Sequence, residues 1–302
     1  MTSAPSADDR RDASLHGVPP AADLLALASE VAEEAAALVV ALRARGDLAV
    51  STKSSPTDMV TEVDQAAEEL IRSRLLAARP HDTILGEEFG MGDAPTEALD
   101  TAAVATLAPA VGTVADTGVR WVVDPIDGTT NFLYGHPGFA VSIAAEVAGH
   151  TVAGVVRVPF PDEVFTATAG GGARRNGEPI SVSSLGDLDR ALVATGFSYD
   201  PDRRRRQGAV LAAVVGQLRD VRRMGAASVD LCSVACGRLD AYWERGLKPW
   251  DHAAGALIAS EAGAVVAELD GGPPGPGCLL AANPALWGPL AHLLDGAGAG
   301  DA

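Results

Sequence analysis

The amino-acid sequence predicts a layered α/β protein with an antiparallel-rich first lobe and a second lobe of alternating strands and helices. Three observations support this fold class. Apolar residues recur at helical spacing between residues 22 and 79, and from residue 139 short β-branched runs follow, separated by turn signals. After residue 191, short apolar runs alternate with helical patterns. Such an order of elements is typical of sheets that are covered by helices.

Two helices are predicted near the start of the chain. Leu, Val and Ala recur at helical spacing over 22–45, where Gly46 marks the end, and a second amphipathic pattern covers 61–79 before Pro80. The stretch 90–118 is small, acidic and without a clear period, so we interpret it as a long loop with at most one helical turn. The run RWVVD that ends at Asp124 predicts a short buried strand.

The middle of the chain predicts a meander of strands. The runs FAVSIAAEV, TVAGVVRVP and EVFTATA are rich in β-branched residues, and Asn176-Gly177 predicts a tight turn in a further hairpin. The second lobe then alternates between the two element types. Its predicted elements are a strand at 191–196, a helix at 203–218, a strand at 220–223, a helix at 226–236, a strand at 239–243, a helix at 251–262, a strand at 264–269 and a last helix near 285–294.

The domain organisation follows from composition along the chain. We predict a disordered arm over 1–20, a single domain over 21–295 with lobes at about 21–185 and 186–295, and a frayed tail over 296–302. The arm is polar and charged, and it lacks the apolar region of a secretory signal. The longest apolar runs fall well short of the length of a membrane span.

Composition also narrows the classes of function. The 23 basic and 40 acidic residues give a net charge of −17, which disfavours a nucleic-acid-binding surface. The basic run Arg203–Arg206 is interpreted as a solvated helix face. Three cysteines argue against a disulfide framework, and Cys232 and Cys236 are interpreted as core residues. We expect a soluble cytoplasmic protein without nucleic-acid or membrane partners, in which metal ions would let acidic residues bind an anionic substrate.

One segment, WVVDPIDGTTN, carries a pair of carboxylates. The strand is expected to end at Asp124, and the proline that follows cannot extend the ladder, so the chain turns and brings Asp127 back beside Asp124. These carboxylates and the carbonyl of Ile126 are hard oxygen ligands suited to Mg²⁺. Gly128 and Thr129 leave room for backbone N–H groups to approach an anion at the start of a helix. The alternative is an Asx-rich turn without a ligand.

Three other carboxylate segments are individually weaker. Glu87 follows the short apolar run ILG, Asp64 lies in the first turn of a predicted helix that Thr61 would cap, and Asp251 lies in the first turn of another helix. Each has an ordinary structural explanation, as a loop acid, as a complement to the helix dipole or as part of a cap. Only their combination with Asp124 and Asp127 indicates a site.

Taken together, these segments resemble the inositol monophosphatase family, within the wider superfamily of lithium-sensitive, magnesium-dependent phosphatases. The resemblance covers about 22–292 and rests on motifs in the expected order. The motifs are DMVTEVD (58–64), GEE (86–88), DPIDGTTNF (124–132) and WDHAAGALIASEAG (250–263). The family implies a sandwich of alternating α-β-α-β-α layers, of the inositol monophosphatase and fructose-1,6-bisphosphatase type. It also implies a homodimer, inhibition by lithium and a small phosphorylated metabolite as partner.

The resemblance also implies residue roles. Two or three Mg²⁺ ions would be bound by Glu87, Asp124, the carbonyl of Ile126, Asp127 and Asp251. Asp64 and Thr129 would orient the attacking water and, with Glu87, form the catalytic group. The substrate would be contacted by Gly128, Thr129, Ala227, Glu244 and Asp251. This chain departs from the family at Met224 and Ala226, where Ser or Thr is frequent. The stretch 90–118 is also longer than is usual in the family.

The implied reaction is direct attack of water on a phosphate monoester, because a metal pair can activate water and stabilise both the phosphate and the leaving alkoxide. Inositol 1-phosphate is the first expected substrate, which makes the chain an inositol-phosphate phosphatase. The alternatives are fructose 1,6-bisphosphate, histidinol phosphate or adenosine 3′,5′-bisphosphate, or a non-catalytic regulatory binding module on the same fold.

Three superficial matches to other motifs carry little weight. The aspartates of haloacid-dehalogenase-type phosphatases are two apart, whereas Asp124 and Asp127 are three apart. Asp116-Thr117-Gly118 is a lone aspartic-protease triplet without the second copy that a dyad requires. The Gly-rich stretch 170–172 lacks the Gly-Lys-Ser/Thr of a P-loop.

Overall fold

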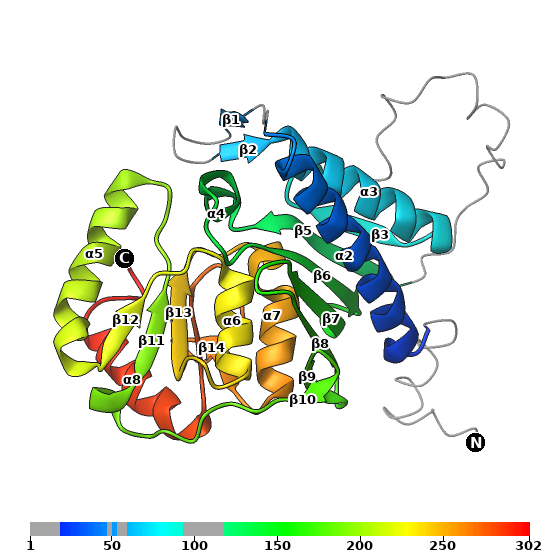
Figure 1. Ribbon diagram of the computed structural model, residues 1–302. Helices are drawn as coiled ribbons and strands as arrows, with labels where there is room; N and C mark the ends of the chain where they lie inside the picture. Colours follow the sequence, from blue (N-terminus) through cyan, green and yellow to red (C-terminus); the bar gives the residue numbers. More distant parts are fainter. Residues whose placement is uncertain (1–18, 47–49, 53–58, 93–117) are drawn as a thin grey trace, which may run out of the picture.

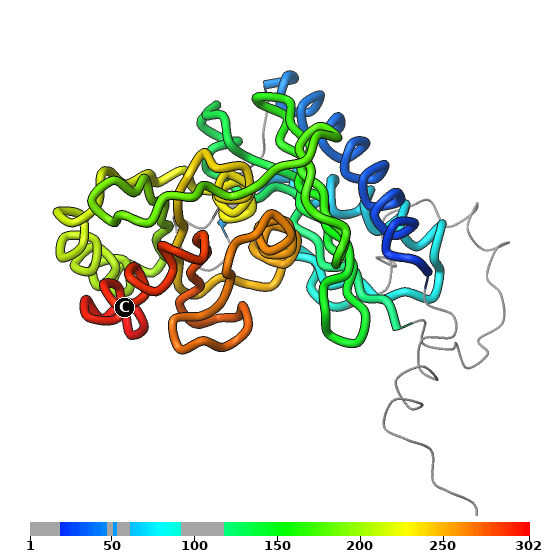
Figure 2. The backbone as a smooth tube through the Cα atoms, turned by 90° about the horizontal axis from the view of Figure 1, so that it is seen from below, coloured from blue at the N-terminus to red at the C-terminus, as the bar shows by residue number. Residues whose placement is uncertain are grey.

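The computed structural model describes residues 19–46, 50–52, 59–92 and 118–302. This part of the chain forms five layers, in the order helix, sheet, helix, sheet, helix (Figure 1). The outer layer on one side is α2 (Ala21–Arg43) with α3 (Glu62–Ala78), the central layer is α6 (Ala227–Ala235) with α7 (Pro249–Glu261), and the outer layer on the other side is α5 (Pro201–Val214) with α8 (Pro284–Gly296). Figure 2, turned by 90° from Figure 1, shows the central pair of helices between the two sheets. The predicted layered α/β fold is confirmed.

The larger sheet has eight strands in the order β10-β9-β8-β7-β6-β5-β3-β4, and all neighbours are antiparallel except β3 and β5. The predicted meander is confirmed, and the Asn-Gly turn joins β9 to β10. The strands are β3 (Thr83–Gly86), β4 (Gly90–Gly92), β5 (Val119–Asp127), β6 (Ala140–Val147), β7 (His150–Val158), β8 (Glu163–Thr168), β9 (Gly172–Arg175) and β10 (Glu178–Pro179). A separate two-stranded ribbon, β1 (Val50–Thr52) with β2 (Met59–Thr61), precedes α3.

Strand β5 does not end at Asp124 as expected but continues to Asp127 through a β-bulge. Asp124 pairs with Ser142 and Asp127 pairs with Ala140, so β5 has one more residue than β6 over this interval. Side chains three apart on a regular strand face opposite sides of the sheet. The extra residue of the bulge reverses that alternation and lets both aspartates face the same side. The pair is therefore brought together within the strand and not by a turn after it.

The smaller sheet has the order β12-β11-β13-β15-β14, with β11 parallel to β12 and β13, and β15 antiparallel to β13 and β14. The predicted alternation of strands and helices is confirmed except for β15, which the sequence did not predict. All five residues of β15 are buried, and it follows a Gly- and Pro-rich stretch. The strands are β11 (Leu192–Thr195), β12 (Asp220–Arg222), β13 (Ala241–Arg245), β14 (Val265–Glu268) and β15 (Cys278–Ala282).

Small residues let the central helices approach the sheets closely. A Cβ atom on Gly154 of β7 would lie 3.0 Å from the backbone Cα of Ala254 in α7, which is closer than nine in ten such contacts in proteins. The surrounding residues of α7 are buried, including Ala253, Ile258 and Ala259, and they pack against the larger sheet. Close packing of this kind fixes where α7 begins, and the first turn of α7 carries Asp251.

We expect Gly154→Ala to lower the free energy of unfolding by about 1–3 kcal/mol, because the added methyl group overpacks the contact with α7. The matched control is Gly208→Ala in α5, where an added Cβ meets nothing within 4 Å. This control should raise the free energy of unfolding by roughly 0.5–1 kcal/mol through helix propensity. Urea unfolding of the two variants measures both effects, and changes of the same sign would contradict this description of the packing.

The C-terminal residues differ from the expected frayed tail. Helix α8 continues to Gly296, Ala299 and Ala302 are only 3% and 5% exposed, and both belong to the core under the smaller sheet. Arg245 donates a hydrogen bond from Nη1 to the carbonyl oxygen of Ala302 at 2.9 Å. The tail is held because its alanines fill the edge of this core. The predicted arm lies almost wholly outside the described residues, as does 93–117 of the predicted long loop, whose first residues form β4.

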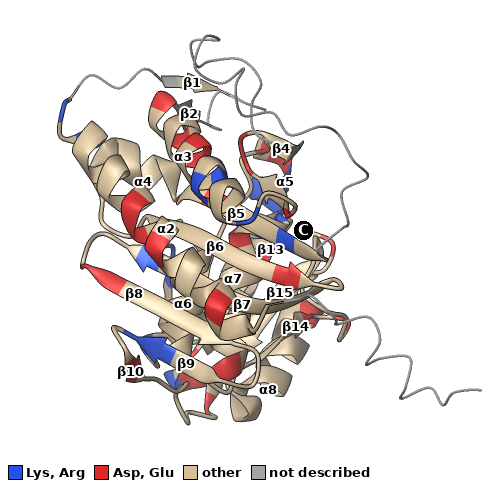
Figure 3. Ribbon diagram, turned by 90° about the vertical axis from the view of Figure 1, so that its right-hand side faces the viewer, with Lys and Arg blue, Asp and Glu red and all other residues tan. Residues whose placement is uncertain are grey.

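Within the described residues, no helix combines the length and apolar character needed to cross a membrane. Cys232 and Cys278 are buried free thiols, and Cys236 is partly buried, in agreement with the core interpretation. On the side of the molecule shown in Figure 3, acidic segments and fewer basic ones are scattered among uncharged residues.

Candidate active site

A cavity of about 120 Å³ lies where the bulge of β5, the turn after β3 and the first turns of α6 and α7 meet. Its wall contains every residue that the sequence assigned to metal or substrate binding. These residues are Glu87, Asp124, Ile126, Asp127, Gly128, Thr129, Ala227, Glu244 and Asp251. Four residues that the sequence did not single out as contacts, Phe197, Tyr199, Arg223 and Leu247, complete the wall together with Gly225.

The four predicted metal-binding carboxylates come from three parts of the fold. Glu87 opens the turn between β3 and β4, Asp124 and Asp127 flank the bulge of β5, and Asp251 lies in the first turn of α7. Burial raises the pKa of Asp124 well above its usual range, and the nearby carboxylates of Glu87, Asp127 and Asp251 raise it further. Burial likewise raises the pKa of Asp251, although its Oδ2 accepts a hydrogen bond from the Lys248 amide at 2.6 Å. The four groups therefore share one strongly negative environment.

Asp127 is oriented by the start of helix α6. Its Oδ2 atom accepts hydrogen bonds from the backbone N–H of Ser228 at 2.7 Å and from the Ser228 hydroxyl at 2.5 Å. This N–H group lies in the first turn of α6, where backbone N–H groups have no acceptor within the helix. Burial raises the pKa of Asp127 to about 7, although both bonds from Ser228 act to lower it. Sequence patterns gave no signal for Ser228, because its partner is 101 residues away.

Asp64 lies behind the cavity wall and reaches it through Thr129. It is fully buried in the first turn of α3, which Thr61 caps as the sequence predicted, and in the structure the two residues form a reciprocal capping box. The Thr129 hydroxyl lies 3.3 Å from Asp64 Oδ1 and 3.1 Å from the carbonyl oxygen of Ile126. A hydroxyl has one proton to donate, so it can serve only one of these acceptors at a time. Asp64 and Thr129 are thus connected at the edge of the carboxylate cluster.

Gly128 is required by the backbone at this point. It has a φ of +88°, in the left-handed region, and it precedes the short helix α4 (Thr129–Tyr134). A Cβ on Gly128 would also lie 3.1 Å from both the Ala226 side chain and the carbonyl oxygen of Gly138. Glycine alone fits this conformation and this space without strain.

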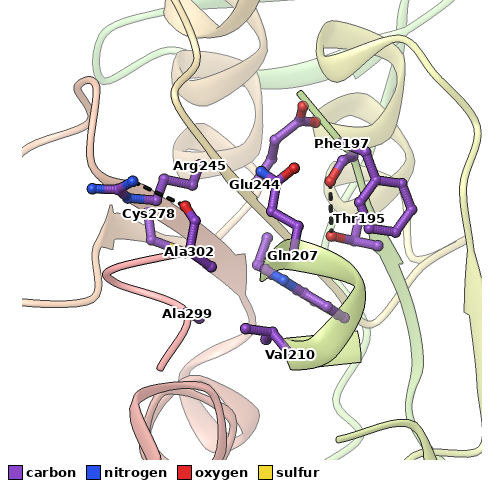
Figure 4. A pocket seen from close by; sticks show the side chains of 11 residues that line it. Thr195, Phe197, Gln207, Val210, Glu244, Arg245, Cys278, Ala299 and Ala302 are labelled. Carbon is purple, nitrogen blue, oxygen red and sulfur yellow. Dashed lines mark hydrogen bonds between the residues drawn. The ribbon is translucent and has the colours of Figure 1, made fainter. Parts of the chain in front are cut away.

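The opposite half of the cavity contains Glu244, Arg223 and two aromatic side chains. Glu244 Oε2 accepts a hydrogen bond from the Tyr242 hydroxyl at 2.6 Å, and burial raises the pKa of Glu244. The Glu244 carboxylate rests directly against Gly196, where a Cβ would lie 1.8 Å from Oε2. Behind it a second, very small cavity is closed by Phe197, Gln207, Arg245 and the C-terminal residues (Figure 4). The Tyr242 hydroxyl and the backbone at Gly196 therefore hold the Glu244 carboxylate in position.

Arg223 is the cationic side chain of this cavity wall. Among the residues that the structure describes, its guanidinium has no hydrogen-bond or ion-pair partner, whereas neighbouring Arg222 pairs with Asp220. Burial has the largest effect on the pKa of Glu244 and raises it, whereas the hydrogen bond from Tyr242 and, to a smaller extent, the positive charge of Arg223 lower it. Phe197 and Tyr199 come from the loop after β11, and Tyr199 is 39% exposed at the rim.

The donor set fits a hard divalent cation. Glu87, Asp124, Asp127 and Asp251 supply carboxylate oxygens and Ile126 supplies a carbonyl, which is the oxygen-only chemistry that Mg²⁺ prefers. In the described ranges, no three or more Asp, Glu, His or Cys side chains already form a ready-made metal cluster. A bound cation would offset the mutual repulsion of these carboxylates and lower the energy of bringing them together. Hydrogen bonds also hold one oxygen each of Asp127 and Asp251.

Comparison with known proteins gives a consistent result. The family model for the inositol monophosphatase family matches residues 21–295. The inositol-1-monophosphatase SuhB of Mycobacterium tuberculosis is 48% identical over 258 residues, which cover 81% of this chain and 83% of that protein. The Nus factor SuhB of Pseudomonas aeruginosa is 40% identical over 251 residues, covering 82% and 86%. The crystal structure of the extragenic suppressor protein suhB from Bartonella henselae superposes with a TM-score of 0.79 at 34% identity and covers 90% of this chain and 98% of that chain.

Proposed function

Because the chain belongs to the inositol monophosphatase family, we propose that it hydrolyses a small phosphate monoester with the help of Mg²⁺, and that inositol 1-phosphate is its substrate. The observation that supports this most is the convergence of four carboxylates and a carbonyl on one cavity, next to the Asp64–Thr129 pair. The phosphatase class follows from the family. The substrate, the metal and the residue roles are proposals.

Each side of the cavity has a distinct role in this proposal. Glu87, Asp124, Ile126, Asp127 and Asp251 would hold two or three Mg²⁺ ions, which supply charge neutralisation and water activation when bound. The Thr129 hydroxyl would hold the attacking water in place while Asp64 accepts a proton through it. The backbone amides of Gly128 and Thr129 would bind the phosphate. No phosphorylated protein intermediate is needed, since the carboxylates are committed to cations.

The alcohol half of the substrate would lie between Ala227, Glu244 and Arg223. Glu244 accepts hydrogen bonds and Arg223 donates them, so together they suit the hydroxyl groups of a cyclitol or sugar. An aromatic rim formed by Phe197 and Tyr199 suits the apolar face of such a ring. Arg223 also disfavours the cationic alcohol of histidinol phosphate, because like charges would be brought together in a partly buried cavity.

The test is phosphate release from inositol 1-phosphate, fructose 1,6-bisphosphate, histidinol phosphate and adenosine 3′,5′-bisphosphate, compared by kcat/KM. We expect inositol 1-phosphate to have the highest value. A clear preference for histidinol phosphate would overturn the proposed substrate and leave the proposed chemistry in place.

We expect Arg223→Gln to lower the ratio of kcat/KM for inositol 1-phosphate over histidinol phosphate by about fivefold or more, which corresponds to roughly 1 kcal/mol. The variant removes the positive charge of Arg223, and with it both the charge-assisted hydrogen bonds to the hydroxyls and the repulsion of a cation. Arg222→Gln is the matched control, because Arg222 lies outside the cavity wall and is paired with Asp220. An unchanged ratio in Arg223→Gln would show that Arg223 does not face the alcohol.

A second candidate function is a non-catalytic regulatory binding module. The relatives called Nus factor SuhB, such as the one from Pseudomonas aeruginosa, are the observation that favours it. The same substrate panel separates the candidates, because a binding module would release phosphate from none of the four compounds. We further propose that the chain is a cytoplasmic homodimer, which size-exclusion chromatography with light scattering would test for the oligomeric state.

A further inference from the structure

Helix α3 carries a stripe of three buried charged side chains. Asp64, Glu68 and Arg72 are four residues apart, so they lie on one face of the helix. Each has a relative exposure of 0%. Burying ionised groups is costly unless each is matched by an opposite charge and by hydrogen bonds. The partners of these side chains therefore indicate what the stripe does.

The Glu68 carboxylate binds the turn that carries Glu87. Its Oε2 accepts a hydrogen bond from the Glu88 amide at 2.7 Å, and its Oε1 accepts one from the Phe89 amide at 3.3 Å. These are the two backbone N–H groups that directly follow Glu87. The carboxylate also occupies the space where a side chain at residue 86 would lie, since a Cβ on Gly86 would be 1.9 Å from Glu68 Oε1. The Glu68 carboxylate thus packs against Gly86 and accepts a hydrogen bond from the Glu88 amide, so it contacts both ends of the Gly-Glu-Glu sequence.

Arg72 binds both the same turn and Glu68. Its Nε donates to Glu68 Oε1 at 2.8 Å, and its Nη2 donates to the carbonyl oxygen of Gly90 at 2.6 Å. The guanidinium also lies over the Phe89 ring, 5.8 Å from the centroid. The ion pair therefore holds N–H groups at one end of the turn and a carbonyl at the other. The backbone of residues 88–90 is anchored to α3 by charge-assisted hydrogen bonds, which are stronger than neutral ones.

From these contacts we propose that Glu68 and Arg72 are positioning residues that fix Glu87 relative to Asp64 by attaching the Glu87 turn to α3. Neither side chain lines the cavity. The first turn of α3 sets Asp64 against Thr129, and the next two turns set the backbone around Glu87. One rigid helix thus places both a water-orienting group and a metal ligand. This inference rests on the proposed function, because it assumes that Glu87 binds a metal.

A purely stabilising role is a poorer explanation of the pair. Well-packed apolar side chains of similar volume are often at least as stabilising as a buried ion pair. The apolar neighbours on α3, Ala67, Ile71 and Leu75, are already packed in apolar cores of this kind. The charged groups stand where backbone N–H and carbonyl groups of the Glu87 turn need partners.

The experiment compares Arg72→Met, Glu68→Gln and the double variant Glu68→Gln/Arg72→Met with matched controls on the same helix. Arg74→Met removes an arginine that pairs with Glu34 at the surface, and Glu69→Gln neutralises an exposed glutamate. The double variant leaves no unpaired buried charge, so it can fold even where Arg72→Met does not. Mn²⁺ binding to the protein without substrate is measured by electron paramagnetic resonance, and exchange of the Glu88 and Phe89 amides is measured by NMR.

We expect the α3 variants that fold to bind Mn²⁺ about tenfold more weakly, to need correspondingly more Mg²⁺ for half-maximal phosphate release and to exchange the Glu88 and Phe89 amides faster. The controls should match the wild type in all three measurements. Wild-type Mn²⁺ affinity and unchanged amide exchange in the folded double variant would overturn the inference and leave the proposed function intact. If the wild type itself bound no Mn²⁺, the metal site of the proposed function would fail, and the inference with it.

Discussion

Asp124→Asn lowers the rate of phosphate release from inositol 1-phosphate by about a thousandfold or more, if Asp124 holds the metal as proposed. Asp124 is 2% exposed and lies next to Glu87, Asp127 and Asp251. The amide keeps the shape of the side chain and removes its charge. The rate loss should therefore appear mainly in kcat, with a further increase in the Mg²⁺ concentration that is needed.

The matched control for Asp124→Asn is Asp82→Asn, because Asp82 is also buried but lies outside the cavity wall. Asp82 accepts a hydrogen bond from Trp121 Nε1 at 2.8 Å and pairs with Arg79, so its loss should reduce stability and leave kcat near the wild-type value. Without metal, Asp124→Asn should unfold at the same temperature as the wild type or higher, because it relieves repulsion among buried carboxylates. A lower unfolding temperature would mean that misfolding caused the rate loss.

Removing divalent metal makes the stability of the protein fall as the pH rises from 6.5 to 8.5. Burial raises the pKa of Asp127 to about 7, and it raises the pKa values of Asp124, Asp251 and Asp230 well above their usual range. A carboxyl with a raised folded-state pKa binds more protons in the folded state than in the unfolded state. Such a carboxyl contributes to the free energy of unfolding below its ordinary pKa of about 4, and this contribution is lost as the pH rises through its folded-state pKa.

His252 shifts stability in the opposite direction but outside this pH window. Burial lowers its pKa to about 4, so it costs stability only as the pH falls below its ordinary value of about 6.5. Between pH 6.5 and 8.5 the carboxylates therefore decide the sign. Saturating Mg²⁺, at about 100 times its dissociation constant, should add about 2.7 kcal/mol and raise the unfolding temperature by roughly 4–5 °C at pH 8.

Thermal unfolding in chelator and in Mg²⁺ at pH 6.5, 7.5 and 8.5 measures this prediction. We expect the unfolding temperature to decrease with pH in chelator and to vary much less in Mg²⁺. An unfolding temperature that rises with pH in chelator, or that does not respond to Mg²⁺, would show that the carboxylate cluster is not a cation site.

Local patterns predicted most helices and the meander, because each of these elements carries its own period. Strand β15 was missed because its five residues are buried on both faces, so no alternation distinguishes Cys278–Ala282 from other short apolar runs. The bulge of β5 was missed for a different reason. It is defined by the register against Ser142 and Ala140, which no local pattern specifies.

The sequence indicated the carboxylates of the cavity wall but not most of the residues that hold them in position. Glu87, Asp124, Asp127 and Asp251 were found through ordered motifs, and the structure places them on one cavity. Ser228 was missed because its hydrogen bond to Asp127 spans 101 residues. Glu68 and Arg72 did leave a signal, since two opposite charges four residues apart interrupt the apolar face of α3 one turn after its capping residue Asp64. Such a break in an apolar stripe indicates a buried ion pair that a neighbouring backbone segment must satisfy.

Metal dependence of the wild-type protein tests the central claim most directly. Phosphate release from inositol 1-phosphate is followed in chelator, then after Mg²⁺ is added back in excess, and in parallel with Asp124→Asn. The proposed site predicts no release above background in chelator, full recovery with Mg²⁺ and no comparable recovery in the variant. Release that continues in chelator, or equal rates in wild type and Asp124→Asn, would contradict it.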